Sequence, residues 1–353
     1  MGVYAKEWVK GKTVFVGLDL HKENWQITAI ADAEVVFENR IAGCWEELKK
    51  VLDKFQDADA IETVYEAGCH GFWVYDQLVE YGVQCIVTPP SLLPVEAGNH
   101  VKTDRRDSRK LAALLSKGML KQVWVPSVQE RHFRQVLRRR RQLVRERVRV
   151  QNQILSELLQ FGMRFPKPQG RWGRQVKENL WRIKFPDRLV QVSFESLLMH
   201  YGQLDAQVKT QTDLIYELAK RPEYAEGVKI YTSAPGIGVL TAMEILLEIG
   251  DMSRFRKAKS LGAYVGLTPS QYSSGEKVRM GRITRVGKAS VRAALIEAAW
   301  TAIRKDAALR EIYERLRARA GAKRAIVGIA RRLLLRLRRM ILDGCPYAFG
   351  IVG

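Results

Sequence analysis

VKTDRRDSRK, residues 101–110, places two carboxylates, Asp104 and Asp107, three residues apart among five cations. If a helix begins here, with Thr103 or Asp104 near its N-cap, the two carboxylates lie on one face, with Cβ atoms about 5–6 Å apart. Two like charges at about 6 Å repel by roughly 3 kcal/mol at an effective dielectric constant near 20. A divalent cation would remove that cost, and the neighbouring arginines could then bind a polyanion. A solvated helix start with mixed charges fits the spacing equally well.

The residues around this segment predict a domain of alternating strands and helices. Strands are expected over 13–20, 24–31, 34–42, 60–65, 83–88 and 122–126, and helices over 45–55, 71–81 and 103–117. The first three strands follow one another directly and predict a meander. The whole order predicts a mixed α/β sheet with helices on its faces.

Two further acids follow predicted strands. Asp19 comes at the end of the first strand, and Glu66 directly follows the strand over 60–65. Ligands of α/β sheets tend to bind beyond the strand ends, so these two acids and the helical pair could converge. Each acid alone is more often an ordinary loop residue, but four in this order favour a common site.

Charge is distributed unevenly along the 353 residues, whose formal net charge is +21. Residues 1–125 carry a net charge of −3, and residues 126–353 carry +24. A basic excess of this size indicates a nucleic acid or another anionic surface as partner. The four cysteines form no CxxC pair, no signal-peptide core opens the chain, and no apolar run reaches a membrane-spanning length. We therefore expect a soluble protein of a reduced, cytoplasmic compartment with no membrane partner.

The middle of the chain predicts a long basic helix over 127–161. Nine arginines and a single acid fall within 131–149, beside an apolar stripe at helical spacing. An ordinary solvated face usually alternates in sign, so the pattern favours nucleic-acid contact, and the stripe leaves room for a coiled-coil or dimer contact. Residues 162–185 are basic, broken by Pro and Gly, and carry Trp172 and Trp181, which suits base stacking or a flexible arm. A second helix over 193–220 is expected to pack back as a hairpin.

The last third holds two motifs. TSAPGIGVLTAMEILLEIGD, residues 232–251, predicts a tight turn with Gly236 and Gly238 that opens an apolar helix. Such a turn exposes backbone N–H groups to a phosphate and resembles the helix-hairpin-helix DNA-backbone module, although a plain tight turn fits as well. Ser274 follows Ser273 in a predicted Gly-rich loop. A serine hydroxyl needs an activating base, cation or metal, and such a loop alone is usually structural. Helices are expected over 290–305, 307–320 and 324–342.

With these residues in place, the chain resembles the DEDD transposases of bacterial insertion sequences. That group includes the pilin-gene-inverting and the bridge-RNA-guided recombinases. The first part is similar to a RuvC-like domain of the RNase H fold through GLDLHK, VYEAG and KTDRRDSRKLA. The last part is similar to the transposase domain through SAPGIGVLTA, FRKAKSLGAYVGLTP, QYSSG and GRITRVGKASVRAAL. The resemblance covers nearly the whole chain and implies three parts: 1–126, 127–225 and 226–353.

The resemblance also implies roles for single residues. Asp19, Glu66, Asp104 and Asp107 would bind one or two Mg²⁺ ions, and Ser274 would form a covalent phosphoserine link with DNA, with Ser273 as the alternative. It implies a homo-oligomer, dimer or tetramer, that acts on donor and target double-stranded DNA, and a noncoding guide RNA as a further partner. The residues assigned to nucleic-acid contact are Arg105, Arg106, Arg138, Arg139, Arg140, Arg141, Arg145, Gly236, Gly238, Lys277, Arg279, Arg282 and Arg285.

The expected chemistry is strand cleavage and exchange through a serine–DNA intermediate. The metal would polarise the scissile phosphate, and the cations after the serine would offset negative charge in the transition state. One alternative is a RuvC-like, metal-dependent nuclease or junction resolvase in which water attacks. Another is a non-catalytic nucleic-acid-binding protein, which explains the basic region but not the four acids.

Overall fold

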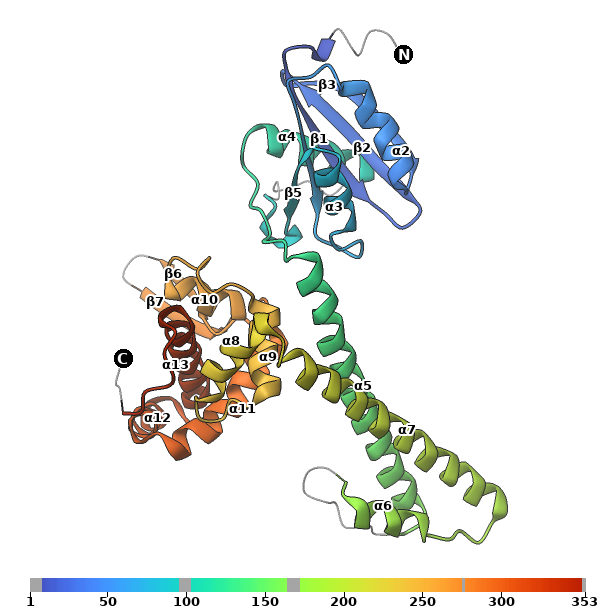
Figure 1. Ribbon diagram of the computed structural model, residues 1–353, viewed down its shortest axis with the longest axis vertical. Helices are drawn as coiled ribbons and strands as arrows, with labels where there is room; N and C mark the ends of the chain where they lie inside the picture. The colour runs from blue at the N-terminus through green and yellow to red at the C-terminus, as the bar shows by residue number, and fades with distance from the viewer. Residues whose placement is uncertain (1–7, 95–102, 164–171, 275–276, 351–353) are drawn as a thin grey trace. The chain divides into compact units, whose positions relative to one another are not determined.

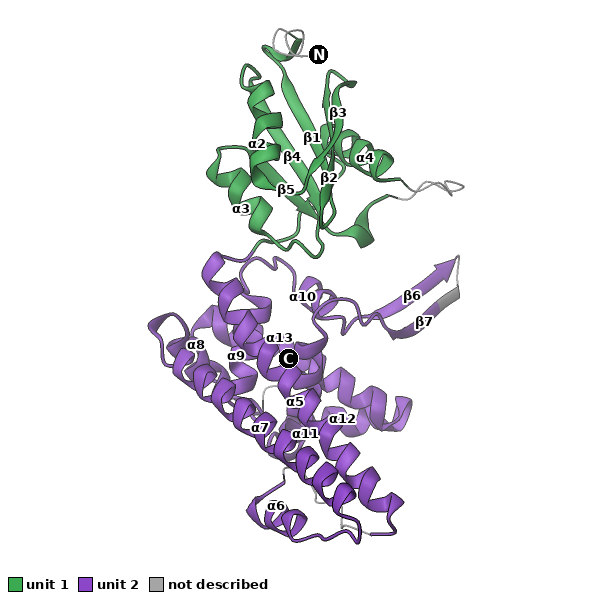
Figure 2. Cartoon of the chain, turned by 90° about the vertical axis from the view of Figure 1, so that its right-hand side faces the viewer, with its two compact units in different colours: residues 1–125 green, residues 126–353 purple. Residues whose placement is uncertain are grey.

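The computed structural model describes residues 8–94, 103–163, 172–274 and 277–350 (Figure 1). The chain divides into two compact units, residues 1–125 and 126–353 (Figure 2). Each unit has its own hydrophobic core. The predicted boundary between residues 225 and 226, inside the second unit, stays a prediction.

The first unit is built on a five-stranded mixed sheet in the order β3-β2-β1-β4-β5. Strands β1, β2 and β3 form the predicted antiparallel meander, whereas β4 pairs parallel with β1 and β5 parallel with β4. This confirms the expected α/β class. The strands are β1 Thr13–Leu20, β2 Asn24–Ala31, β3 Glu34–Ala42, β4 Ala60–Glu66 and β5 Gln84–Thr88, and the helices are α2 Trp45–Leu52, α3 Trp73–Glu80 and α4 Asp104–Ser116, with 3-10 turns η1 Asp53–Phe55 and η2 Pro90–Leu92.

Helices cover both faces of this sheet, and the alternation of side chains along β1 assigns each face. Val16 and Leu18 are buried with residues of α2 and α3. Phe15 packs on the opposite side with Val64 of β4 and Leu111 of α4. Figure 2 shows α2 and α3 on one side of the strands and α4 on the other. Residues of β1 and β4 that share a face with Phe15 and Val64 therefore point toward α4.

Gly17 lets α4 approach the sheet closely. A Cβ atom at this position would lie 2.6 Å from the backbone nitrogen of Ala112 and closer still to the carbonyl oxygen of Ser108. Any side chain here would push the helix away from β1. Ser108 is buried and its hydroxyl lies 2.8 Å from the hydroxyl of Thr28 on β2, which ties the same turn of the helix to the sheet.

The predicted strand over 122–126 is wrong. These residues form no strand, although the amide of Val123 donates to the carbonyl of Val87 at 2.7 Å. One backbone hydrogen bond to β5 is not a ladder, and Pro126 ends the segment without an amide to donate.

The second unit begins with a long helical hairpin. Helix α5, Val128–Gln160, starts with a capping box between Ser127 and Glu130 and confirms the predicted helix. Helix α7, Arg188–Leu218, begins five residues earlier than expected because the Asp187 carboxylate accepts from the amide of Leu189 at 2.7 Å. The two helices pack along each other with the short helix α6, Arg174–Trp181, at their far end (Figure 1).

Trp172 belongs to the core of this hairpin. It is 3% exposed, and its ring centroid lies 5.0 Å from that of Tyr201 on α7. It therefore packs within the protein and is not available to stack on a nucleobase, whereas Trp181 is exposed. Residues 164–171 of the predicted nucleic-acid segment lie outside the described residues.

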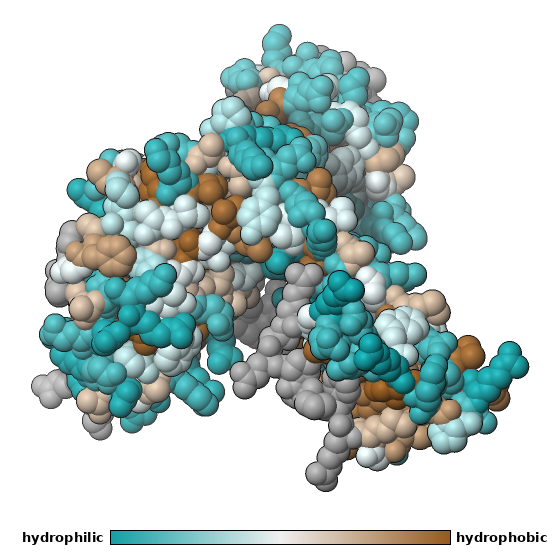
Figure 3. All heavy atoms as spheres, turned by 60° about the horizontal axis from the view of Figure 1, so that its bottom comes forward, coloured by the Kyte–Doolittle hydropathy of each residue, from teal (hydrophilic) through white to brown (hydrophobic). Residues whose placement is uncertain are grey.

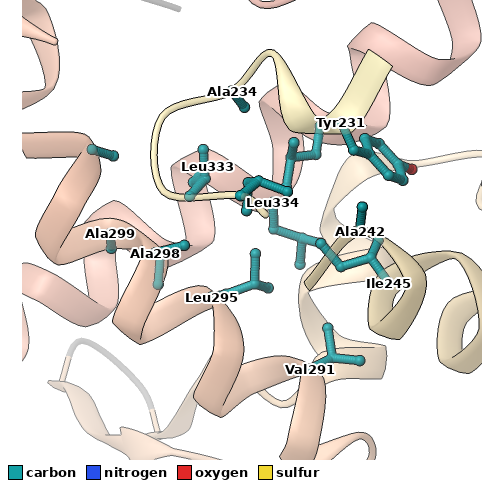
Figure 4. Packing of buried hydrophobic residues seen from close by; sticks show 14 of the residues in the cluster. Tyr231, Ala234, Ala242, Ile245, Val291, Leu295, Ala298, Ala299, Leu333 and Leu334 are labelled. Carbon is teal, nitrogen blue, oxygen red and sulfur yellow. The ribbon is translucent and has the colours of Figure 1, made fainter. Parts of the chain in front are cut away.

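The remaining helices form a bundle around one core. Figure 4 shows side chains of α8, α9, α11 and α13 meeting there, Leu333 and Leu334 among them. The turn 235–238 opens α9 as predicted, with Gly238 as its N-cap. Gly236 has φ +84°, and a Cβ there would lie 3.0 Å from the Cα of Ala298 on α11. The helices are α8 Pro222–Thr232, α9 Val239–Ile249, α10 Ala258–Val265, α11 Ala289–Lys305, α12 Ala307–Ala320 and α13 Ala322–Asp343.

A two-stranded hairpin projects from this bundle (Figure 2). Its strands are β6, Pro269–Ser274, and β7, Lys277–Ile283. The predicted Gly-rich loop around Ser274 is thus corrected: the serine is the last residue of a strand, paired with Lys277. None of the helices that the structure describes is long and apolar enough to span a bilayer.

Candidate functional site

Strand pairing places two of the four acids side by side. In the parallel register, Leu18 of β1 lies opposite Tyr65 of β4, so Asp19 and Glu66 are the next residues on neighbouring strands. Asp19 follows Gly17 by two residues, and Glu66 follows Val64 by two, so both side chains point to the face covered by α4. Their spacing is set by the backbone ladder and not by a loop.

The other two acids occupy the first turn of α4. The Thr103 hydroxyl accepts from the amide of Arg106 at 3.4 Å and caps the helix, as the sequence predicts. Asp104 and Asp107 both lie in that first turn, where the helix dipole favours negative charge. The close approach at Gly17 therefore brings the acidic end of α4 over the strand end that carries Asp19.

A histidine joins the two groups of acids. Nε2 of His21 lies 3.2 Å from Oδ2 of Asp19 and 3.3 Å from Oδ1 of Asp104. One possible ligand atom from each of the three residues lies within 4.8 Å of the other two. Asp104 and His21 are well exposed to solvent, whereas Asp19 is mostly covered. The three side chains form an open cluster that a small cation can reach.

Electrostatics also indicate a place for a cation. Burial raises the pKa of Asp19, the negative charges of Asp104 and Asp107 raise it further, and His21 opposes this rise. The ionised form of Asp19 is thus disfavoured by its surroundings, and a divalent cation would reverse that. Carboxylate oxygens are the ligands that Mg²⁺ prefers, so the two carboxylates of the cluster could hold a magnesium ion.

Sequence reasoning missed two residues of this site. His21 was not predicted to take part, although it stands two residues after Asp19 in GLDLHK, at the turn between β1 and β2. Gly17 was not recognised as the contact point of α4. Its signal was available, since a glycine inside a strand often marks the close approach of another backbone segment.

Two arginines of α4, Arg105 and Arg109, have a carboxylate partner within the first unit. Arg109 donates from Nη2 to the Glu38 carboxylate at 3.1 Å, and Arg105 pairs with the same carboxylate. Glu38 is nearly buried on β3. Arg105 is therefore a counter-ion in this state, and its assigned contact with nucleic acid stays a prediction, as does that of Arg106.

The basic face of α5 is partly neutralised by acids of α9. Glu248 accepts from Arg141 at 2.7 Å and from Lys288 at 2.9 Å, with Arg138 at 3.3 Å. Glu244 lies one turn earlier and contacts Arg141 at 3.1 Å. Burial acts to raise the pKa of Glu248, but Lys288 and Arg138 overcome it and lower the pKa to about 2. Arg138 and Arg141 thus hold α5 against α9.

Other arginines of α5 differ in their surroundings. Arg140 donates to the Thr212 hydroxyl of α7 at 2.8 Å, and Arg147 pairs with Asp205 at 2.7 Å. Arg139 and Arg145 are exposed, and neither forms an ion pair with another residue that the structure describes. Among the predicted contacts of this helix, these two are best placed to meet a polyanion.

Ser274 lies exposed on the β6–β7 hairpin of the second unit. The base of the hairpin is held by the amide of Thr284, which donates to the carbonyl of Thr268 at 2.9 Å. Gly266 allows close packing there, since a Cβ would lie 2.9 Å from the amide of Val286. Arg279, Arg282 and Arg285 are exposed, and Lys277 is described only in its backbone.

Two family models match this chain, and the first of them continues past the end of the first unit into α5. A family model for the DEDD transposases of the IS110 group, described as "Transposase", matches residues 16–163, and the model described as "Transposase IS116/IS110/IS902 family" matches residues 228–314. A putative transposase, y4qE, of Sinorhizobium fredii is 30% identical over 298 residues, 82% of this chain and 72% of the relative. The transposase of insertion sequence element IS1533 of Leptospira borgpetersenii is 25% identical over 93% of this chain and 95% of its own.

Proposed function

This chain belongs to the DEDD transposase family of bacterial insertion sequences, and on that premise we propose that it cuts and rejoins DNA through a serine–DNA intermediate. The observation that carries the proposal is the convergence of Asp19, Asp104 and His21. Glu66 follows Tyr65 on the strand next to Asp19, and Asp107 lies in the same first turn of α4 as Asp104, but neither belongs to this three-residue cluster. A metal ion held by such a cluster could bind the phosphodiester of a DNA substrate.

Four carboxylates would hold the metal: Asp19, Glu66, Asp104 and Asp107. When bound there, Mg²⁺ supplies Lewis-acid polarisation of a phosphoryl oxygen. Asp19 and Glu66 sit on paired strands, and Asp104 and Asp107 sit on a helix capped by Thr103, so their backbones are fixed before substrate arrives. Preorganisation of this kind avoids a reorganisation cost during the reaction.

Ser274 is the proposed nucleophile. Its Oγ would attack the scissile phosphorus, the bond from phosphorus to the leaving deoxyribose oxygen would break, and the hydroxyl proton would pass to that oxygen through solvent. Attack by a hydroxyl at the end of another strand would reverse the step and release Ser274. Each exchange conserves one phosphodiester, so the balance needs no nucleotide cofactor. Arg279 and Arg282, exposed on the same hairpin, would offset charge on the phosphate.

Three finer features belong to the same proposal. The acids and Ser274 lie in different units of one chain, which suits a homo-oligomer in which one subunit supplies acids and another the serine. Arg139 and Arg145 on α5, together with Gly236 and Gly238 before α9, would bind phosphates of donor and target DNA. A noncoding RNA would select the sites, since arginine-rich helices bind either polymer through phosphates.

The covalent intermediate is tested with a nicked DNA substrate that traps it. Wild-type protein should give a protein–DNA adduct in Mg²⁺, and Ser274→Ala should lose it while Ser273→Ala keeps it. An adduct at wild-type level in Ser274→Ala would move the role to another residue. Cleavage without rejoining at full rate in Ser274→Ala would instead favour the water-attack nuclease, because such an enzyme uses the acids alone.

A further inference from the structure

A turn held by backbone and indole hydrogen bonds carries His21. Its amide donates to the carbonyl of Asn24 at 3.1 Å, and its carbonyl accepts from Nε1 of Trp25 at 3.1 Å. Trp25 is fully buried in the core of the first unit. The backbone of His21 is thus anchored to that core, although its side chain is about half exposed.

The distances from His21 to the acids match those between neighbouring ligands of one metal ion. Two ligands that each lie about 2.1–2.2 Å from an ion and meet it at a right angle are about 3.0–3.1 Å apart. Nε2 of His21 lies 3.2 Å from Oδ2 of Asp19 and 3.3 Å from Oδ1 of Asp104. The ligand atoms of Asp19 and Asp104 also lie within 4.8 Å of each other, so a single ion could contact all three residues once the two carboxylates close on it.

We propose that His21 is a direct nitrogen ligand of the metal held by Asp19 and Asp104, and that it makes the site bind divalent first-row transition metals in preference to Mg²⁺. This inference rests on the proposed metal site and adds its selectivity. Imidazole binds first-row transition metals well, whereas Mg²⁺ favours oxygen donors. A site made only of carboxylates has no such nitrogen to distinguish the two ions.

The opposing interpretation is that His21 only forms an ion pair with the two carboxylates. An exposed pair of this kind contributes little to stability. It would make His21 a competitor of the metal, so that removing the ring would strengthen binding of every divalent cation. The two interpretations therefore predict opposite changes in affinity.

The test uses the full chain loaded with Mn²⁺ and pulsed electron paramagnetic resonance, which detects a directly bound ¹⁴N nucleus. Wild-type protein should show the nitrogen coupling, and both His21→Ala and His21→Gln should lose it. His132→Ala, which removes an exposed histidine of α5, is the matched control and should keep it. The proposal is overturned if wild-type protein shows no nitrogen coupling, or if the coupling persists in His21→Gln.

Calorimetric titration gives the second readout. His21→Ala should weaken Mn²⁺ binding by about tenfold or more, and should change Mg²⁺ affinity much less. His21→Gln offers an amide oxygen, so it should retain Mg²⁺ and lose the preference for Mn²⁺. Tighter binding of both ions in His21→Ala would establish competition and end the proposal.

Failure of the selectivity and failure of the site itself are distinguishable. If Asp19→Asn and Asp104→Asn abolish Mn²⁺ binding while no nitrogen coupling appears, the carboxylate site stands and only the role of His21 is wrong. If neither aspartate variant alters Mn²⁺ binding, the metal site of the proposed function fails, and the role of His21 fails with it.

Discussion

Two helices of this molecule each carry a pair of carboxylates one turn apart, and the two pairs behave in opposite ways. Asp104 and Asp107 lie in the first turn of α4 at an open strand end, with a histidine as neighbour. Glu244 and Glu248 are buried on α9 among Arg138, Arg141 and Lys288. The same helical spacing thus occurs in the proposed metal site and in a buried ion-pair network, and the residues around each pair distinguish the two.

The cations explain the difference. Burying Glu248 costs desolvation, but three cations from α5 and the start of α11 compensate it. On α4, Arg105 and Arg109 pair instead with Glu38, and the pKa of Asp19 is raised by burial and by its acidic neighbours. The acids around Asp19 raise one another's cost of ionisation, whereas the acids of α9 are held by cations of neighbouring helices.

We call Asp104 and Asp107 the open pair, and Glu244 and Glu248 the buried pair. The largest effect should come from removing one carboxylate of the open pair. Asp104→Asn should lower strand cleavage by about 10³-fold, since the Lewis-acid role of a metal is worth several kcal/mol. Rates on supercoiled or junction DNA in Mg²⁺ would measure this. Thermal unfolding measured without divalent metal should be nearly unchanged, so loss of activity through unfolding would contradict the assignment.

The buried pair should respond in stability. Glu248→Gln leaves three cations without their carboxylate and should lower the unfolding free energy by about 3–5 kcal/mol. Glu244→Gln is the matched control and should cost much less, because burial raises the pKa of Glu244 and its carboxylate pairs with Arg141, whereas that of Glu248 pairs with three cations. Urea unfolding of the two variants checks this. Equal losses in both would show that the cations do not distinguish the two residues.

Acid should weaken the buried network at a defined pH. The pKa of Glu248 is lowered to about 2 in the folded chain from an ordinary value of 4.5, so its stabilisation is present above pH 4.5 and is lost as the pH falls toward 2. Glu244 has a raised pKa and acts in the opposite direction. Hydrogen exchange of α9 amides should therefore speed up between pH 4.5 and 2, after correction for intrinsic rates, and Glu248→Gln should flatten that change.

Metal should stabilise the open pair and leave the buried pair unaffected. Mg²⁺ or Mn²⁺ at a hundredfold excess over Kd should add about 2.7 kcal/mol to the unfolding free energy of the first unit. Thermal unfolding with and without chelator measures the shift. Asp104→Asn should abolish it, whereas Glu244→Gln should retain it. A shift of wild-type size in Asp104→Asn would place the ion elsewhere.

The smallest effect concerns the arginines of α5. Arg139→Ala combined with Arg145→Ala should reduce the slope of log K against log salt concentration for DNA binding by about 2, since two phosphate contacts are lost. Stability should change little. Arg138→Ala combined with Arg141→Ala should instead lower stability, because these side chains pair with Glu248. Salt titrations of binding, paired with unfolding curves, separate the two sets. Equal salt slopes would contradict the distinction.

Much of the fold could be predicted from the sequence because local signals were strong. The spacing of apolar residues, the helix-capping residues and the turn residues together predict three features: the β1–β3 meander, the capped helix at Asp104 and the long helix that begins after Ser127. The start of α7 was placed five residues late, since the cap at Asp187 lies beyond a break of Pro and Gly.

The sequence-based predictions fail where the role of a residue depends on partners that are distant along the chain. The run of arginines on α5 lacks alternating acids in sequence, but Glu244, Glu248 and Asp205 supply them from α9 and α7. Trp172 looked like a stacking residue and proved to be core. His21 could not be assigned from sequence reasoning, because its partner Asp104 is 83 positions away along the chain and is brought near by the packing of α4 at Gly17.

The length of α5 has a consequence for how the second unit can engage a duplex. Its 33 residues, at 1.5 Å each, form a rod of about 50 Å. With a rise of 3.4 Å per base pair, a rod laid along B-form DNA would extend past about fifteen base pairs. Bound in this way, α5 would protect about one and a half turns of the duplex from nuclease digestion.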